Sequence, residues 1–247
     1  MTTEARFVQA LALGLDPAWR RLPAPERCDD ARSFTAAVER APGVQTHTYS
    51  MLGLQAGSDL LIWRLGASLD ALEEAAAAAL RTGLGRWMTV TESLLGVIQE
   101  SQYVRKPTAQ EQSLFTGERS RYLVVYPFTK GTDWYLMGRD ARQGVMNEHM
   151  RIGHDYPQVR QLLANSFGLD DMDFLVAYET DDLAAFSQLV RDLRGSESRR
   201  STVRDTPILT AVHRSLAEIT AMLGATAVDG DRSAPTPAPP PRGGKEE

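Results

Sequence analysis

The chain contains an internal repeat at a constant offset of 114 residues. The segment SDLLIWRLGASLDALEEA, which starts at Ser58, aligns with MDFLVAYETDDLAAFSQL, which starts at Met172. Each copy reads as a strand, then a polar N-cap residue, then an amphipathic helix. A repeat of this length predicts two similar units in one chain. The identical pairs are Asp59 with Asp173, Leu61 with Leu175, Leu69 with Leu183 and Ala71 with Ala185.

Extending the comparison outward predicts the order β-α-β-β-α-β in each half. This order is that of a ferredoxin-like unit. We therefore expect an α+β fold of two tandem ferredoxin-like units, a dimeric α/β barrel with antiparallel sheets and the helices outside. The predicted strands are 7–13, 46–52, 59–65 and 90–99, then 122–128, 159–166, 173–179 and 207–213, and the predicted helices are 25–40, 68–81, 139–151 and 182–194.

The repeat also predicts the domain boundaries. Residues 1–102 form the N-terminal half, 103–120 a polar linker, and 121–225 the C-terminal half. The tail 226–247 is rich in Pro, Gly and charge and is expected to be disordered. Tyr103, Arg105 and Lys106 of the linker either contact a ligand at the mouth of the sheet or lie in a solvated loop.

Composition excludes several classes of protein. The net charge of -5 comes from interspersed charges, which argues against nucleic acid as a partner. Cys28 is the single cysteine, so one chain can build neither a disulfide framework nor a cysteine-rich metal site. No apolar run reaches the length of a membrane span, and the N-terminus does not read as a signal peptide. We expect a cytoplasmic protein.

The stretch MNEHMRIGH places His149 and His154 five residues apart. Two histidines that chelate one metal from a helix need a spacing of three or four, whereas five residues correspond to about 140° around the helix. Gly153 and the following DYP predict that the helix ends before His154. One histidine remains a candidate ligand. A single histidine makes a poor zinc site but suffices as an axial ligand of haem iron.

The segment YLVVYPFTKGTDWYLMGRDARQGVMNEH, residues 122–149, resembles the chlorite dismutase-like family of haem proteins, which includes coproheme decarboxylases. The motifs that carry the resemblance are YP-x-x-K, the WY pair, the EH near the helix end and the GLDD before the next strand. The resemblance covers roughly residues 85–216, and it reaches the first half mainly through the repeat. It implies tandem ferredoxin-like units, haem as the cofactor, and a homo-oligomer that is a pentamer.

The resemblance implies a role for individual residues. His149 matches the haem iron ligand and therefore the metal-binding residue. Trp134 and Tyr135 match aromatic positions beside the haem, and Arg105 lies in the loop that matches a propionate-binding segment in part. Glu197 lies where the family often places a carboxylate near the histidine.

Three further residues point to an activity within the family. Gln161 stands where chlorite dismutases carry an arginine, and Tyr126 stands where they carry an aliphatic residue; both match coproheme decarboxylases. Lys130 matches the lysine of the same motif, as a proton or carboxylate partner. The implied reaction uses hydrogen peroxide, Tyr126 relays the oxidising equivalent, and propionates of iron coproporphyrin III leave as CO₂ to give haem b. Arg199 departs from the family, which has a serine near that position.

Three functions therefore compete. The first is peroxide-dependent oxidative decarboxylation of coproheme. The second is a peroxidase or chlorite-decomposing enzyme with haem b as a fixed cofactor. The third is a haem-binding or sensing protein without enzymatic activity, because the amide of Gln161 is neither a strong acid nor a strong base.

Overall fold

The computed structural model describes residues 6–98 and 118–226. Every strand and helix predicted for the two halves is present. The elements of the first half are β1 (Arg6–Leu15), η1 (Pro17–Arg21), α1 (Ala24–Glu39), β2 (Val44–Gln55), β3 (Ser58–Gly66), α2 (Leu69–Leu80), η2 (Gly83–Trp87) and β4 (Met88–Ile98). Those of the second half are β5 (Tyr122–Lys130), α4 (Thr132–Leu136), α5 (Arg139–His154), β6 (Arg160–Asn165), β7 (Phe174–Thr180), α6 (Leu183–Arg194), η3 (Glu197–Ser201), β8 (Thr202–Arg204), β9 (Leu209–His213) and α7 (Leu216–Leu223).

The polar caps inferred from the repeat are present. The Ser68 hydroxyl accepts from the Ala71 amide at 3.2 Å, and the Asp182 carboxylate accepts from the Ala184 and Ala185 amides at 3.0 Å. A side-chain oxygen at this position satisfies amides that have no partner within the helix. The two helices therefore begin at equivalent points of the repeat.

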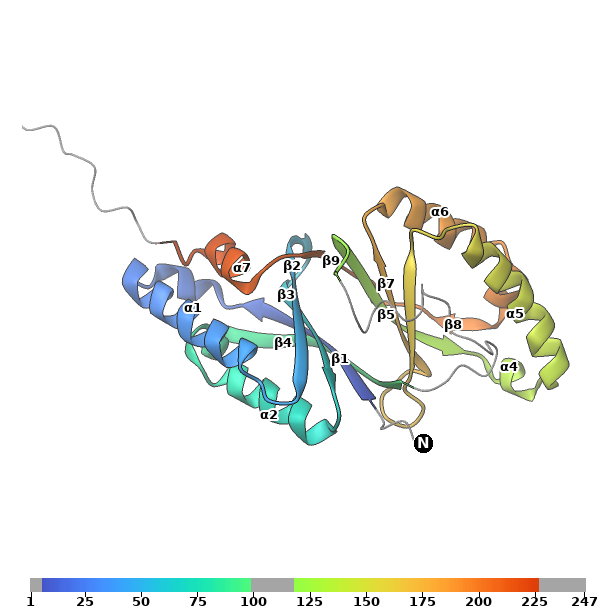
Figure 1. Ribbon diagram of the computed structural model, residues 1–247, viewed down its shortest axis with the longest axis horizontal. Coiled ribbons are helices and arrows are strands. Elements are labelled where there is room, and N and C mark those ends of the chain that lie inside the picture. The colour runs from blue at the N-terminus through green and yellow to red at the C-terminus, as the bar shows by residue number, and fades with distance from the viewer. Residues whose placement is uncertain (1–5, 99–117, 227–247) are drawn as a thin grey trace, which may run out of the picture.

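The strands close into an antiparallel barrel. The order β7-β6-β4-β1-β3-β2-β9-β5 returns to β7 because β5 also pairs with β7, and β8 is added at the end of β5. The two halves meet at two seams, β4 with β6 and β2 with β9. Figure 1 shows helices α1, α2 and α7 outside one half and α4, α5 and α6 outside the other.

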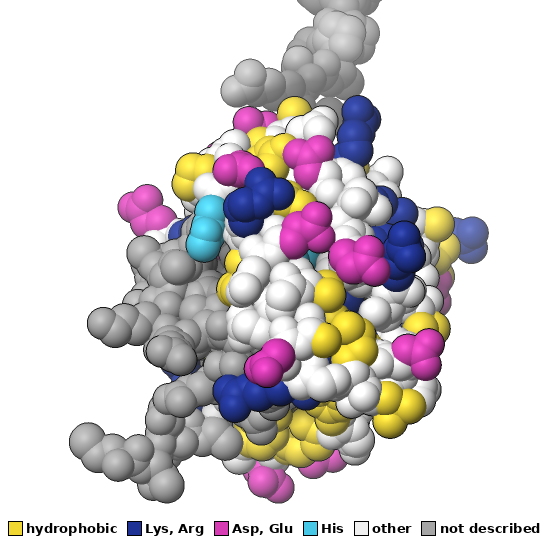
Figure 2. Space-filling model, turned by 90° about the vertical axis from the view of Figure 1, so that its right-hand side faces the viewer, with side chains coloured by type: hydrophobic (Ala, Val, Ile, Leu, Met, Phe, Trp, Pro, Cys, Tyr) yellow, Lys and Arg dark blue, Asp and Glu magenta, His cyan; other side chains and the backbone are white. Residues whose placement is uncertain are grey.

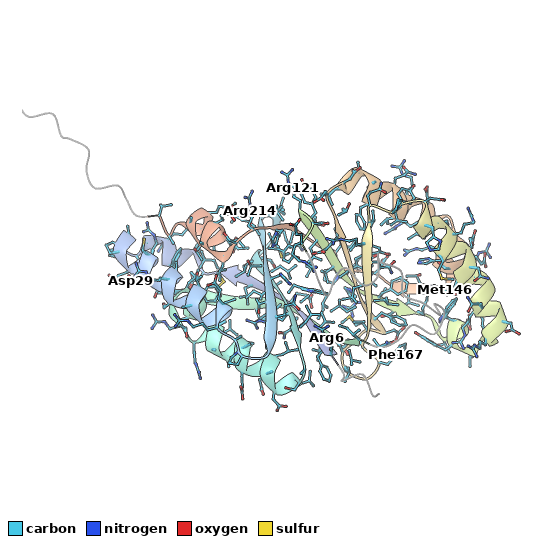
Figure 3. The ribbon with its side chains drawn as sticks, in the orientation of Figure 1. Arg6, Asp29, Arg121, Met146, Phe167 and Arg214 are labelled. Atoms are coloured by element: carbon cyan, nitrogen blue, oxygen red, sulfur yellow. The ribbon has the colours of Figure 1, made fainter. Side chains whose placement is uncertain are left out.

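One hydrophobic core fills the interior of the barrel and takes residues from both halves. Trp63, Tyr49 and Leu61 of the first half pack with Leu123 and Leu175 of the second, and all are fully buried. Figure 3 shows side chains filling this space. Because residues alternate between faces of a strand, the neighbouring positions point outward to the helices. The outward faces form two further clusters, one under each set of helices.

A buried carboxylate joins the halves inside the barrel. Glu179 of β7 accepts a hydrogen bond from the Tyr49 hydroxyl of β2 at 2.8 Å, and Arg160 of β6 lies 2.9 Å from its other oxygen. Glu179 has no exposed surface. A buried charge is stable only when paired, so this contact helps to fix the two halves in one arrangement.

The prediction for the end of α5 was wrong. The helix runs through Gly153 to His154, and Asp155 is its C-cap. Gly153 does not have a positive φ, so its backbone remains helical and does not end the helix. The stop comes from the segment that leads to Pro157. Helices α4 and α7 were not predicted, although α7 begins with a capping box of Ser215 and Glu218.

None of the helices in the described part of the chain has the length and apolar character needed to cross a lipid bilayer. On the end of the molecule formed by the second half, Figure 2 shows acidic and basic side chains mixed over the surface. This face therefore has no stripe of one charge sign, in agreement with the interspersed charges of the sequence.

Candidate functional site

The outward face of β5, β6 and β7 brings Tyr126 and Gln161 to the same side of the sheet. Tyr126 is in register with Val176, and Gln161 is in register with Tyr178. Val176 and Tyr178 both belong to the cluster under α5 and α6, as Tyr126 does. Cross-strand partners share a face, so Gln161 faces the helices as well.

Arg160, the neighbour of Gln161, faces the opposite way. Its guanidinium lies 2.9 Å from the buried carboxylate of Glu179 and donates to the Ser120 hydroxyl at 2.8 Å. The side chain is thus engaged on the barrel side of the sheet. The strand alternation that separates Gln161 from Arg160 in the sequence is confirmed, and a neutral amide occupies this position of the helix-facing surface.

His149 lies on α5 and is half-buried. Its Nδ1 is 3.3 Å from the hydroxyl oxygen of Ser198. Burial, and next the positive charge of Lys130, lower the pKa of His149 to about 4. The imidazole is therefore neutral at pH 7, which is the form that binds a metal ion. No hydrogen bond found among the described residues uses its Nε2.

Lys130 and η3 form the surroundings of this histidine. The Lys130 ammonium is buried, donates to the Ser198 carbonyl at 2.7 Å, and lies 4.6 Å from the centre of the Trp134 ring. Burial, together with the nearby Arg199, lowers the pKa of Lys130 to about 8. Ser198 thus contacts the lysine through its carbonyl and the histidine through its hydroxyl.

Glu197 does not contact the histidine ring. Its carboxylate lies 3.3 Å from Arg200, and its backbone amide donates to the Glu148 carboxylate at 3.0 Å. The expectation that Glu197 places a carboxylate beside His149 is therefore wrong, and the hydroxyl of the next residue, Ser198, lies there instead. The short helix η3 turns Ser198 inward and Glu197 outward, and a local alignment without a fixed register does not distinguish these neighbours.

The two aromatic residues of α4 point in different directions. Trp134 is 3% exposed and packs under the Lys130 ammonium. Tyr135 is 38% exposed, and its hydroxyl donates to the Asp173 carboxylate at 2.6 Å. Its ring also meets Phe167 edge-on at 5.8 Å. Figure 3 labels Phe167, on the loop after β6, and Met146 on α5.

Tyr126 stacks on Tyr178 of the neighbouring strand, with ring centres 6.1 Å apart and an interplanar angle of 27°. Burial raises the pKa of Tyr126 well above its usual value, and the contact with Tyr178 raises it further. Burial raises the pKa of Tyr178 to about 12. Both phenols therefore keep their protons at any physiological pH. Tyr178 was not singled out in the sequence, although the repeat placed it on the strand before α6.

Two arginines lie near this pair. The Asp205 carboxylate is 2.5 Å from Arg199 and 3.4 Å from Arg194. The charge of Asp205 raises the pKa of Tyr126 and that of Arg194 lowers it. One carboxylate between two guanidinium groups leaves a net positive charge. This charge suits an anionic ligand.

The other candidates lie elsewhere. His154 is exposed in the last turn of α5, and His47 and His213 belong to β2 and β9. Arg105, Tyr103 and Lys106 lie outside the described residues. In residues 6–98 and 118–226, no three His, Cys, Asp or Glu side chains gather as a group that could hold a metal ion. A single histidine is sufficient as the protein ligand of an iron porphyrin, because the porphyrin brings four nitrogen donors of its own.

The residues present fit an iron porphyrin with carboxylate side chains. His149 offers a neutral imidazole, and Lys130 and Arg199 offer cations. Helix α5 has 16 residues and no fully buried side chain, so it does not pack closely along its length. Leu163, on the helix-facing side of β6, is 44% exposed. An apolar side chain on this face of the sheet is thus left partly uncovered by the protein.

Three comparisons show which known proteins this chain is similar to. A family model described as chlorite dismutase matches residues 27–214. Coproheme decarboxylase from Mycolicibacterium smegmatis (strain ATCC 700084 / mc(2)155) is 28% identical over 197 residues, which are 79% of this chain and 84% of that protein. The structure of chlorite dismutase from Candidatus Nitrospira defluvii in complex with imidazole aligns with a TM-score of 0.82 and 29% identity, over 91% of this chain and 97% of that chain. A mutant of the same enzyme aligns equally well, with a TM-score of 0.82 and 29% identity, over 91% of this chain and 98% of that chain.

Proposed function

Because the chain belongs to the chlorite dismutase family, we propose that it binds an iron porphyrin and catalyses the peroxide-dependent oxidative decarboxylation of coproheme to haem b. The relative from Mycolicibacterium smegmatis carries the name of this activity. The observation that carries the proposal is the helix-facing surface of the second half. It combines Tyr126 and Gln161 on one sheet face, and the neutral His149 lies on the helix that covers this half.

The pair Tyr126 and Gln161 favours decarboxylation over the conversion of chlorite. Stabilising an anionic oxidant in the pocket requires a positive charge, and the amide of Gln161 has none. The nearest arginine in the sequence, Arg160, is engaged with Glu179 on the other side of the sheet. Tyr126, whose phenol stays protonated, is in turn a suitable donor of a hydrogen atom.

Each residue has a proposed task. His149 holds the iron through Nε2, with Ser198 orienting the ring through Nδ1. Lys130 and Arg199 hold propionate carboxylates, and the lowered pKa of Lys130, about 8, lets it release a proton more readily than an exposed lysine. Tyr126 gives up its phenolic hydrogen and takes one from a propionate side chain. When bound, the iron porphyrin supplies the reaction of peroxide that oxidises Tyr126.

The finer description of the architecture is part of the proposal. The strand orders β4-β1-β3-β2 and β6-β7-β5-β9 support two tandem ferredoxin-like units, because both place the third strand beside the first. The domain boundaries at 102, 120 and 225 belong to the same proposal; residues 99–117, with most of the linker, and 227–247, with most of the tail, lie outside the described residues. A propionate contact from Arg105 and assembly into a homopentamer rest on the resemblance to the family, and the cytoplasmic location rests on the composition of the chain.

A second candidate is a peroxidase or chlorite-decomposing enzyme that keeps haem b. The observation in its favour is the structural alignment with chlorite dismutase over nearly the whole of that enzyme. A haem-binding protein without turnover is the third. The three differ in what happens to the porphyrin when an oxidant is added.

One experiment separates the three. Purified apo-protein is loaded with iron coproporphyrin III and titrated with hydrogen peroxide, and the porphyrin is analysed by mass spectrometry. Each propionate that becomes a vinyl group loses two electrons, so one peroxide is consumed for each CO₂ released. We expect stepwise loss of two carboxyl groups. Bleaching without decarboxylation contradicts the proposal, and rapid oxygen release from chlorite supports the second candidate.

A further inference from the structure

Tyr178 occupies the central position of the proposed site. Strand β7 lies between β6 and β5, so Tyr178 stands between Gln161 on one side and Tyr126 on the other. Its ring centre is 6.1 Å from that of Tyr126 and 5.2 Å from that of Phe186 on α6. It is 4% exposed, whereas Tyr126 is only half-buried. The residue more shielded from water is therefore the one that the proposed reaction does not use.

The two phenol rings lie on adjacent strands and stack with an interplanar angle of 27°. No ion pair of the described residues involves either phenol. Two phenols that are stacked, in contact and uncharged have O–H bonds of nearly the same strength.

We propose that Tyr178 is a second oxidisable residue of the site and exchanges a hydrogen atom with Tyr126. This inference rests on the proposed function, in which peroxide, acting through the bound iron porphyrin, oxidises Tyr126. In the exchange, the O–H bond of Tyr178 breaks and the O–H bond of Tyr126 forms. One proton and one electron move together, so no further reactant is needed and the charge of the pair is unchanged.

The exchange has a consequence for the reaction. Two propionates are oxidised in turn, so Tyr126 is oxidised more than once while the porphyrin stays in place. A radical held on Tyr178 is away from water and from solvent reductants, and it returns to Tyr126 when a propionate is in position. Tyr178 thus holds an oxidising equivalent supplied by one peroxide until the propionate that it will oxidise is in position.

The test is freeze-quench electron paramagnetic resonance of the complex with iron coproporphyrin III after addition of peroxide. Wild type is compared with Tyr178→Phe, which keeps the ring and its packing. Because the two phenols are chemically alike, we expect roughly half of the wild-type tyrosyl signal to arise from Tyr178 and to be lost in the variant. The remaining signal should decay faster. Tyr156→Phe, which removes a hydroxyl that donates to Asp192, is the matched control and should leave the spectrum unchanged.

A readout without the porphyrin checks the contact itself. In apo-protein labelled with ¹³C at the tyrosine ζ carbon, Tyr178→Phe should shift the resonance of Tyr126 and lower its pKa, whereas Tyr156→Phe should do neither. If the tyrosyl spectrum and its lifetime are the same in wild type and in Tyr178→Phe, the inference is overturned. The proposed function is not affected by that result. Absence of any tyrosyl signal in loaded wild type overturns both, even if the apo-protein shows the contact.

Discussion

Replacing Arg64 by Met should make the protein more stable. Arg64 of β3 has no exposed surface, and its Nε and Nη1 have no hydrogen-bond partner among the described residues. Its one hydrogen bond there runs from Nη2 to the Ala75 carbonyl at 3.5 Å. In the repeat it corresponds to Tyr178, so a charge stands where the second half has a phenol. A buried charge without a counter-ion is costly.

The size of the effect follows from the environment of the guanidinium. Burial lowers the pKa of Arg64 from 12.5 to about 10, and a change of this size corresponds to roughly 3 kcal/mol. The lost bond to Ala75 subtracts about 1 kcal/mol. Methionine is unbranched and flexible enough to fill the space. We expect a net gain of roughly 1–3 kcal/mol, comparable with the replacement of other buried charges by apolar residues.

Urea denaturation followed by circular dichroism measures this gain, and a thermal melt should rise by roughly 2–4 °C for each kcal/mol. Arg64→Lys keeps a buried charge and should not stabilise. Arg32→Met removes an exposed arginine of α1 and should change stability by less than about 0.5 kcal/mol. If Arg64→Met lowers the stability, the guanidinium has a stabilising partner outside the described residues.

Three further predictions concern other contacts. Burial and the charges of Arg119 and His213 lower the pKa of His47 to about 4. Between pH 6.5 and 4 the unfolded chain therefore takes up a proton that the folded chain does not, and the free energy of unfolding falls as pH decreases through this window. Urea denaturation at several pH values should show a shallower fall for His47→Gln, and an unchanged slope would refute the assignment. Tyr49→Phe removes a buried hydrogen bond to the Glu179 carboxylate and should cost about 1–3 kcal/mol by the same assay, whereas a neutral result would show that the arginines alone satisfy the carboxylate. His149→Ala should leave the apo-protein as stable as wild type but abolish the histidine-ligated ferric absorption spectrum after loading, and a native spectrum in this variant would reject the ligand.

The repeat accounts for how much of the fold could be predicted. Matching positions such as Asp59 and Asp173 set the register of both halves, and a strand followed by a polar cap is a local pattern. Helix α7 could not be placed by the repeat, because it lies beyond the aligned segments, and the corresponding positions after β4 lie outside the described residues. The closure of the barrel through β2 with β9 and β4 with β6 depends on contacts between distant segments, which no local pattern specifies.

The candidate site, like the fold, could be predicted from the sequence only in part. Gln161 and Tyr126 share a face because strands alternate, so their juxtaposition could be expected from the sequence. The contact of Ser198 with His149 could not be expected, because a shift of one residue along a short helix decides whether Ser198 or Glu197 faces the histidine. Tyr178 was missed because a tyrosine in a buried strand has the pattern of a core residue, and only its stacking on Tyr126 distinguishes it.

The mass of the porphyrin after peroxide titration tests the central claim most directly. Wild type and Tyr126→Phe are loaded with iron coproporphyrin III and given the same amounts of hydrogen peroxide. We predict that wild type yields the product that has lost two carboxyl groups, with one peroxide consumed per group, and that Tyr126→Phe returns unaltered coproheme. Equal decarboxylation by both proteins, or none by wild type, would contradict the account.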